Sequence, residues 1–132
     1  MKRIISFLVL FTLLFSLTAC DGYVSSFKAV GLVRSNTSHS CKTSFLSLEG
    51  QIVFKLKRSE AGEGDISYSV EAKEGEIHLY YAIGDVKEEL AVAKGGEKIT
   101  SRGGYVEGKK PVYIIIEATE ESRGAVSVDL DK

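Results

Sequence analysis

Strict alternation of apolar and polar side chains is the feature that most constrains this chain. Apolar residues recur at every second position in five segments: residues 51–57, 65–72, 76–83, 111–118 and 125–130. Side chains of a β-strand point alternately to its two faces, so a period of two predicts strands with one buried face. Glycine-containing segments separate these strands at spacings of roughly ten residues, which is typical of an antiparallel sandwich or barrel.

Three further segments are less regular. Residues 23–33 and 41–48 fit additional strands, while Val86–Lys94 fits either a strand or one stripe of a helix. We expect a strand there, surface turns at residues 35–40 and 103–110, and no long helix. Two sheets must then cover each other's apolar faces. The expected fold class is all-β: an antiparallel β-sandwich, jelly-roll-like, of about 7–9 strands.

The first 20 residues have a different character. Lys2 and Arg3 precede an apolar stretch over residues 4–18, which is shorter than the roughly 20 residues that a helix needs to cross a bilayer. A basic start followed by a short apolar run is typical of a secretory signal peptide. The stretch closes with Leu17-Thr18-Ala19-Cys20.

That closing tetrapeptide resembles the lipobox of bacterial lipoproteins at all four positions. The resemblance implies that diacylglycerol is attached to the thiol of Cys20 and that a signal peptidase cleaves between Ala19 and Cys20. Two acyl chains would then anchor the chain stably. An uncleaved signal anchor is the alternative. Asp21 resembles the inner-membrane retention signal of Gram-negative cells and would carry no sorting meaning in Gram-positive ones.

Three parts are therefore expected. Residues 1–19 form the cleaved signal peptide, residues 20–26 form the lipidated N-terminus with a short tether, and residues 27–132 form the sandwich domain. The protein is expected on the extracytoplasmic side of the cell membrane. No cofactor is expected other than the covalent diacylglycerol on Cys20.

Charge argues against nucleic acid as a partner. The chain has 17 basic and 18 acidic residues, and loss of Lys2 and Arg3 leaves 15 against 18. Nucleic-acid binding needs a clustered basic face, whereas these basic residues are scattered along the chain.

Cys41 is the only cysteine besides Cys20, so a lipidated Cys20 leaves no intrachain disulfide. We expect Cys41 to be a small buried apolar residue. The alternative is a reactive thiol, because His39 would share a face with Cys41 in an extended chain and a Cys–His pair can perform nucleophilic catalysis. We expect no catalytic residue.

A recognition surface is predicted on the polar faces of neighbouring strands. Tyr80 and Tyr113 would point outward there, with His78, Glu71 and Glu117 as hydrogen-bonding neighbours. Aromatic rings flanked by polar groups suit a sugar ring or a protein partner. A solvated sheet face is the alternative interpretation.

Two other motifs are expected to carry no function. Residues 103–110 approach a phosphate-binding loop, but Lys110 stands where serine or threonine is needed and Pro111 then opens a strand. Glu60, Glu63 and Asp65 could supply oxygen ligands to calcium, yet the EF-hand spacing is absent. No metal site is expected.

Beyond residue 20, the order of glycines and strands resembles small surface lipoproteins with a jelly-roll-like β-sandwich. It is also similar to carbohydrate-binding and peptidase-associated sandwich domains. The segments that carry this resemblance are residues 50–57, 65–72, 76–84, 103–105, 112–118 and 124–128. It implies a fold more than a function.

The expected function is a non-enzymatic binding domain, anchored at the outer face of the membrane, for an unknown protein partner or glycan. One alternative is an accessory or assembly subunit of an envelope complex. The other is a small hydrolase-type enzyme that uses His39 and Cys41, or His78, with acidic loop residues.

Overall fold

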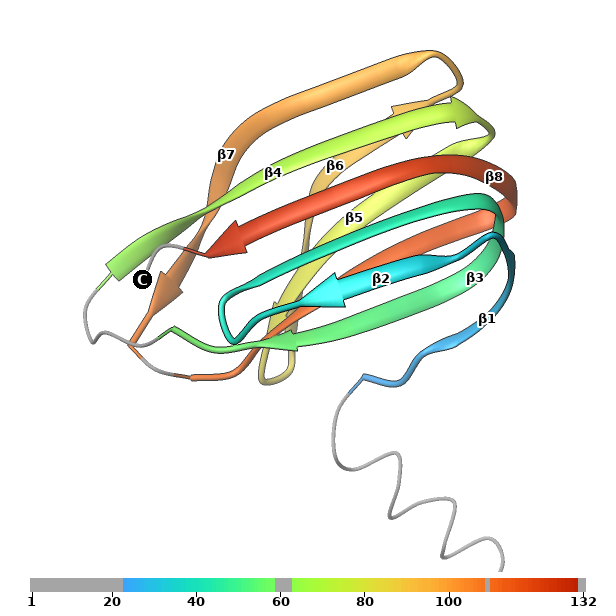
Figure 1. The fold of residues 1–132 in the computed structure, drawn as a ribbon. Helices are drawn as coiled ribbons and strands as arrows, with labels where there is room; N and C mark the ends of the chain where they lie inside the picture. The colour runs from blue at the N-terminus through green and yellow to red at the C-terminus, as the bar shows by residue number, and fades with distance from the viewer. Residues whose placement is uncertain (1–22, 59–62, 109, 131–132) are drawn as a thin grey trace, which may run out of the picture.

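Eight antiparallel strands and no helix make up the described part of the chain (Figure 1). The computed structural model describes residues 23–58, 63–108 and 110–130. Its strands are β1 (Ser26–Val30), β2 (Val33–Asn36), β3 (Ser40–Leu56), β4 (Glu63–Glu74), β5 (Glu76–Ile83), β6 (Val86–Lys94), β7 (Glu97–Glu107) and β8 (Val112–Leu130). The prediction of an all-β antiparallel sandwich of 7–9 strands is confirmed.

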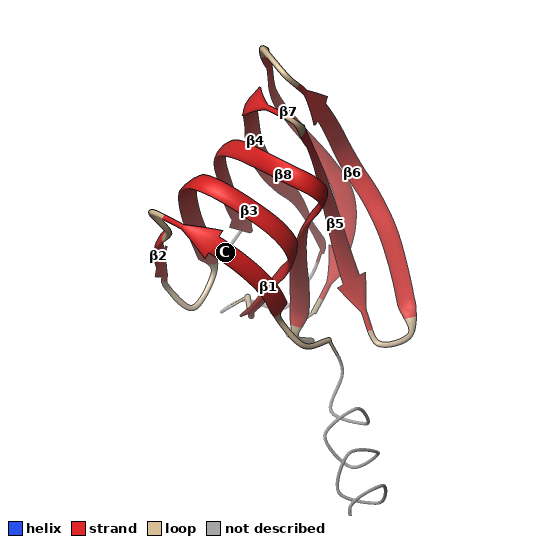
Figure 2. Cartoon of the chain, turned by 90° about the vertical axis from the view of Figure 1, so that its right-hand side faces the viewer, coloured by secondary structure: helices blue, strands red, loops and turns tan. Residues whose placement is uncertain are grey.

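Two long strands, β3 and β8, belong to both layers of the sandwich. The second half of β3 and the first half of β8 pair with each other and lie between β1 and β5, and β6 continues beyond β5. The other halves lie between β2 and β4, and β7 continues beyond β4. We call these the β5 layer and the β4 layer; Figure 2 shows them side by side.

A bend in β3 joins its two halves. Register shifts between Phe45, Leu48 and Gly50 change which residues face inward, from odd to even positions. Gly50 has a positive φ of 116°, and a Cβ there would meet the carbonyl oxygen of Ser26 at 2.4 Å, so only glycine fits. The two segments expected at 41–48 and 51–57 are therefore one bent strand, and β8 unites the segments expected at 111–118 and 125–130 in the same way.

The core lies between the layers and follows the alternation of the sequence. Its fully buried side chains include Leu48, Ile52, Leu56, Ile66, Val70, Ile77, Leu79, Val106, Val112, Ile114 and Ile116. Burial of one aliphatic side chain stabilises a fold by about 1.5–3 kcal/mol, so this set of apolar side chains is the main source of stability. Within the described residues, every buried side-chain nitrogen or oxygen has a hydrogen-bond partner; the hydroxyl of Thr43, for example, donates to the carbonyl of Val33 over 3.0 Å.

Three local predictions had different outcomes. Val86–Lys94 is a strand, as predicted. The turn expected at 103–110 is wrong for residues 103–107, which continue β7 and pair with β4. Tyrosine rings pack closely against this strand at Gly103 and Gly104. A Cβ on Gly104 would lie 3.1 Å from the Tyr81 ring. The surface turn expected at 35–40 is shorter, because residues 35 and 36 belong to β2 and residue 40 to β3.

Candidate functional site

The structure brings together four of the five residues of the predicted recognition surface. In the β5 layer, His78 lies opposite Glu117, and Ala82 lies opposite Tyr113, while Tyr80 lies between them. The four predicted residues are His78, Tyr80, Tyr113 and Glu117. Their side chains point outward, because the adjacent residues Leu79, Tyr81, Ile114 and Ile116 belong to the core. We call the outer side of β3, β8, β5 and β6 in this layer the tyrosine face.

Glu71 does not belong to the tyrosine face. It lies on β4, opposite Ala125 of β8 and Lys98 of β7, on the outer side of the other layer. The sequence placed Glu71 correctly on the polar side of its strand, but alternation alone cannot say which sheet a strand joins.

Tyr80 and His78 form one half of the tyrosine face. Their rings are nearly parallel, at an interplanar angle of 11° and a centroid distance of 6.1 Å. The Tyr80 hydroxyl lies 3.3 Å from Nδ1 of His78. The two side chains stand two residues apart on one strand, so they hold each other in place.

Lys87 completes this half from β6. Its ammonium group lies 4.3 Å from the centroid of the Tyr80 ring, within the range of a cation–π interaction, and 3.7 Å from a carboxylate oxygen of Glu117. Sequence reasoning missed Lys87, because its contact depends on the pairing of β6 with β5.

Carboxylates surround the Tyr80 hydroxyl. Burial raises the pKa of Tyr80 above its ordinary value, and the negative charges of Glu117, Glu89 and Glu76 raise it further. Glu76 and Glu89 also approach the two ring nitrogens of His78, at 3.5 and 3.8 Å. Tyr80 therefore remains a neutral hydrogen-bonding group in an acidic neighbourhood.

Tyr113 forms the other half of the tyrosine face, and the ring of Tyr23 packs against the ring of Tyr113. The two rings lie 5.4 Å apart at an angle of 54°, and the Tyr23 hydroxyl donates to the carbonyl of Gly84 over 3.5 Å. The chain before β1 therefore reaches across β3 and β8 to the β5–β6 turn. No signal in the sequence marks this contact, because it joins residues 61 positions apart.

Ser25 and Gln51 hold the segment before β1 in position. The Ser25 hydroxyl accepts from the backbone N–H of Val53 over 2.9 Å, and the Gln51 amide donates to the carbonyl of Val24 over 3.0 Å. The segment thus extends the ladder between β1 and β3 by side-chain hydrogen bonds.

The aromatic residues cover a small apolar layer of their own. Ile115 and Ala82 point to the outer side of the sheet, yet both are completely buried and lie outside the main core. The tyrosine face is consequently a packed surface with a polar rim, and its rings are already in contact with Lys87 and Tyr23.

Cys41 is buried, as expected, with only 3% of its surface exposed. Removal from water raises the pKa of its thiol to about 12, so the nucleophilic thiolate does not form at neutral pH. His39 is half-buried in the turn before β3, and its Nδ1 lies 3.4 Å from the Ser38 hydroxyl. This burial argues against the Cys–His alternative.

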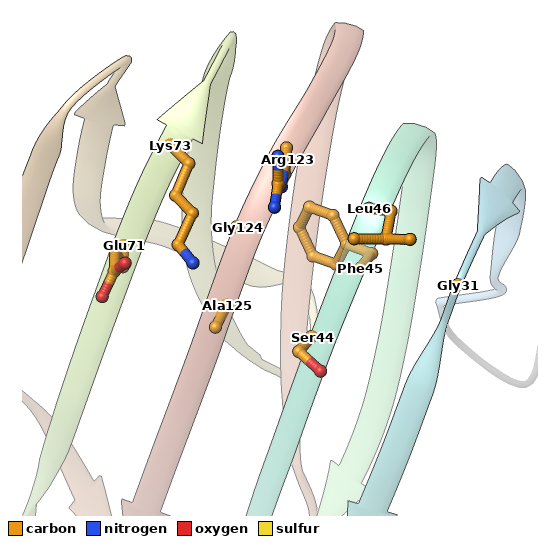
Figure 3. A pocket seen from close by; sticks show the side chains of 9 residues that line it. All are labelled: Gly31, Ser44, Phe45, Leu46, Glu71, Lys73, Arg123, Gly124 and Ala125. Carbon is orange, nitrogen blue, oxygen red and sulfur yellow. The ribbon is translucent and has the colours of Figure 1, made fainter.

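A separate shallow pocket of about 280 Å³ lies on the outer side of the β4 layer, and Glu71 lines it. Figure 3 shows its charged side chains, with Glu71 and Lys73 on β4 and Arg123 on β8, while Leu46 stands on β3. No aromatic ring is exposed in it, because Phe45 is buried in the core. The lining suits small charged groups more than a sugar ring.

No group of three or more histidine, cysteine or acidic side chains in the described parts of the chain is arranged to hold a metal ion. Of the acidic residues considered for calcium, Glu60 and the side chain of Glu63 lie outside the described residues.

No protein-family model matches this chain, and neither does any curated protein. Among solved structures, the chain is similar to a family 29 carbohydrate binding module, with 12% identity and a TM-score of 0.43 over 80% of this chain and 75% of that one. A structure titled "CBM4 structure and function" has 14% identity and a TM-score of 0.43 over 84% and 79%. At these levels the similarities assign no ligand or binding residue to this chain.

Proposed function

We propose that the chain is a lipoprotein anchored through Cys20 on the extracytoplasmic side of a membrane, and that its β-sandwich is a non-catalytic domain that binds a protein partner. The anchor is supported by the lipobox-like ending of the N-terminal segment. It is also supported by the position of Tyr23, which already contacts the domain three residues after Cys20. No helix of the described chain is long and apolar enough to cross a membrane.

One observation supports the binding role above all: an aromatic ring surrounded by partly exposed charges. His78, Lys87 and Glu117 retain 21%, 35% and 31% of their side-chain surface around Tyr80. Tyrosine is enriched among interface hot spots. Charges of both signs around it can give a partner specificity through electrostatic complementarity. Such a cluster offers a partner apolar contact, hydrogen bonds and charge pairing within one patch.

A protein is favoured over a glycan because the ring faces are occupied. A sugar that stacked on Tyr80 from the side of Lys87 would have to displace the ammonium group, and one on Tyr113 would meet Tyr23. A protein partner needs no open ring face and can pair with Lys87 and Glu117 where they stand. The observation that favours a glycan as second candidate is the presence of two outward tyrosines on adjacent strands.

The binding proposal is tested by crosslinking in intact cells that produce the full-length chain. A photoreactive amino acid at position 80 should give a covalent adduct with one envelope protein. The same probe at position 100, which is exposed on β7 in the other layer, should not. Lys87→Glu should reduce the adduct at position 80 severalfold, because it reverses a charge of the proposed patch.

Equal adducts at both positions, or none at position 80, would contradict a protein partner at the tyrosine face. In the second case, an NMR titration with envelope glycans and peptidoglycan fragments decides the glycan alternative. Localised shifts at His78, Tyr80 or Glu117 would establish it. The anchor is tested separately: mass spectrometry of the processed chain should find diacylglycerol on Cys20, and Cys20→Ser should abolish both the lipid and the cleavage.

A further inference from the structure

The tyrosine face is organised in rows that run across four strands. The row nearest the β5–β6 turn contains Lys55, Tyr113, Ala82 and Lys87, from β3, β8, β5 and β6 in that order. The next two rows are Val53, Ile115, Tyr80 and Glu89, and then Gln51, Glu117, His78 and Val92. The first row is therefore basic and aromatic, while the acids stand in the rows behind it.

The chain leading to Cys20 leaves the domain at the first row. Tyr23 lies against Tyr113 and bonds to Gly84 in the adjacent turn. Three residues of extended chain span at most about 10 Å, so a lipid on Cys20 holds its headgroup layer within that distance of Tyr23.

We propose that the first row together with Tyr23 is a membrane-contact surface, which binds the anionic headgroups of the bilayer that holds Cys20. The inference rests on the proposed lipid anchor, and Lys87 belongs both to this surface and to the proposed protein-binding patch. Tyrosine suits this place because its ring is apolar and its hydroxyl is polar, as in the aromatic belts of membrane proteins. Lysines near the surface are attracted to anionic lipids.

Lys55 carries most of the expected attraction. It is exposed and stands directly opposite Tyr113. Lys87 is already paired with Glu117. The negative charge of Asp85, which is exposed in the β5–β6 turn, reduces the attraction to anionic headgroups further. The net effect is a modest basic surface, which orients a domain that the lipid already holds and would not bind a membrane by itself.

A fixed orientation follows from this contact. The tyrosine face lies near the membrane, so a partner that binds Tyr80 must reach it at the membrane surface. The outer side of the β4 layer, with the pocket of Figure 3, then points away from the lipid.

Tryptophan fluorescence tests the orientation, because the chain contains no tryptophan of its own. The processed, lipidated protein is reconstituted in vesicles of phosphatidylcholine and phosphatidylglycerol that include a lipid with a quencher in its headgroup. Val86→Trp, at an exposed position next to Lys87 and 66 residues along the chain from Cys20, should be quenched severalfold more than Leu46→Trp, which reports from an exposed site on the β4 layer. Equal quenching of the two reporters would overturn the inference.

Charge reversal tests the role of the lysines. Lys55→Glu combined with Lys87→Glu should reduce the quenching of Val86→Trp in mixed vesicles to the value found in pure phosphatidylcholine. The control pair Lys42→Glu and Lys98→Glu, exposed on the β4 layer, makes the same change in net charge and should leave it unaltered. Equal effects of both pairs would overturn the headgroup contact.

Failure of the anchor is distinguishable from failure of this contact. A protein that does not float with the vesicles has no anchor, and the contact falls with it. A protein that floats but shows no preferential quenching at position 86 keeps its anchor and refutes the contact surface alone.

Discussion

Lys87 places its ammonium group 4.3 Å from the centroid of the Tyr80 ring. The two residues lie on neighbouring strands, β6 and β5, and only the antiparallel pairing of those strands brings them together. A cation–π contact of this kind contributes about 0.5–1 kcal/mol at an exposed site. It also holds Lys87 within reach of Glu117, so a ring, a cation and an acid form one unit.

Ionisation of Tyr80 should respond to the acids around it. Tyr80 is expected to lose its proton at a higher pH than an ordinary tyrosine, and Glu117→Gln should lower the pKa of Tyr80 because it removes a nearby negative charge. An NMR titration of the ring carbon next to the hydroxyl measures this pKa. Glu49→Gln, on the exposed side of β3, should leave it unchanged, and an equal shift in both variants would contradict the proposed cause.

Burial of Cys41 makes stability depend on pH in the alkaline range. The thiol of the unfolded chain ionises near its ordinary pKa of 9.0, whereas the folded thiol remains protonated up to about 12. Between these values the unfolded state binds fewer protons, so the free energy of unfolding should fall as pH rises, by at most ~1.4 kcal/mol per pH unit from this group.

Denaturant unfolding of residues 22–132 at several pH values measures this effect. Cys41→Ala should show a smaller decline than the natural chain between pH 9.0 and 12. In the same fragment at neutral pH, a thiol reagent should modify Cys41 only after unfolding. Rapid modification of the folded fragment would contradict the burial of Cys41.

Gly124 should tolerate no side chain. A Cβ at this position in β8 would lie 2.0 Å from the carbonyl oxygen of Glu71 and 2.8 Å from Ile77, so the strands would have to separate. Gly124→Ala should destabilise the fold by about 1–3 kcal/mol or more, as overpacking does. Thermal unfolding measures the loss; Gly95→Ala, where the nearest atoms lie at an ordinary 3.8 Å, is the matched control and should change stability little.

Tyr23 should stabilise the domain although it precedes the first strand. Tyr23→Ala would uncover Tyr113 and the small apolar layer beneath it, and we expect a loss of about 1–2 kcal/mol in the free energy of unfolding. Val24→Ala is the control, because Val24 is 59% exposed. Similar values for the two variants would mean that the Tyr23 contact contributes nothing.

Ile115→Ala gives an independent measure of the layer under the tyrosines. Ile115 is fully buried on the outer side of β8, and removal of a buried isoleucine typically costs about 2–5 kcal/mol. Val30→Ala, at a strand position that is 63% exposed, should cost far less. A small loss at Ile115 in a denaturant titration would show that the outer layer is loosely packed.

Local patterns sufficed for the five regularly alternating segments and for most of the core, but they did not predict β7. The alternation of Ile52, Phe54 and Leu56 fixes which side of the second half of β3 is buried, because successive side chains of a strand point to opposite faces. The same rule put Tyr80 and His78 on the outer side of β5. The expected glycine-rich turn was wrong at residues 103–107, where Gly103 and Gly104 lie within β7 and allow Tyr68 and Tyr81 to approach that strand.

What the sequence by itself determined is the all-β class, the inward and outward sides of the five regularly alternating segments, and the burial of Cys41. These depend on period and composition, which act over a few neighbouring residues. Only the tertiary structure decided which strands share a sheet, that Glu71 stands apart from Tyr80, and that Tyr23 and Lys87 cover the predicted surface. Those contacts depend on which strands pair with each other. The residue types alone do not predict that pairing.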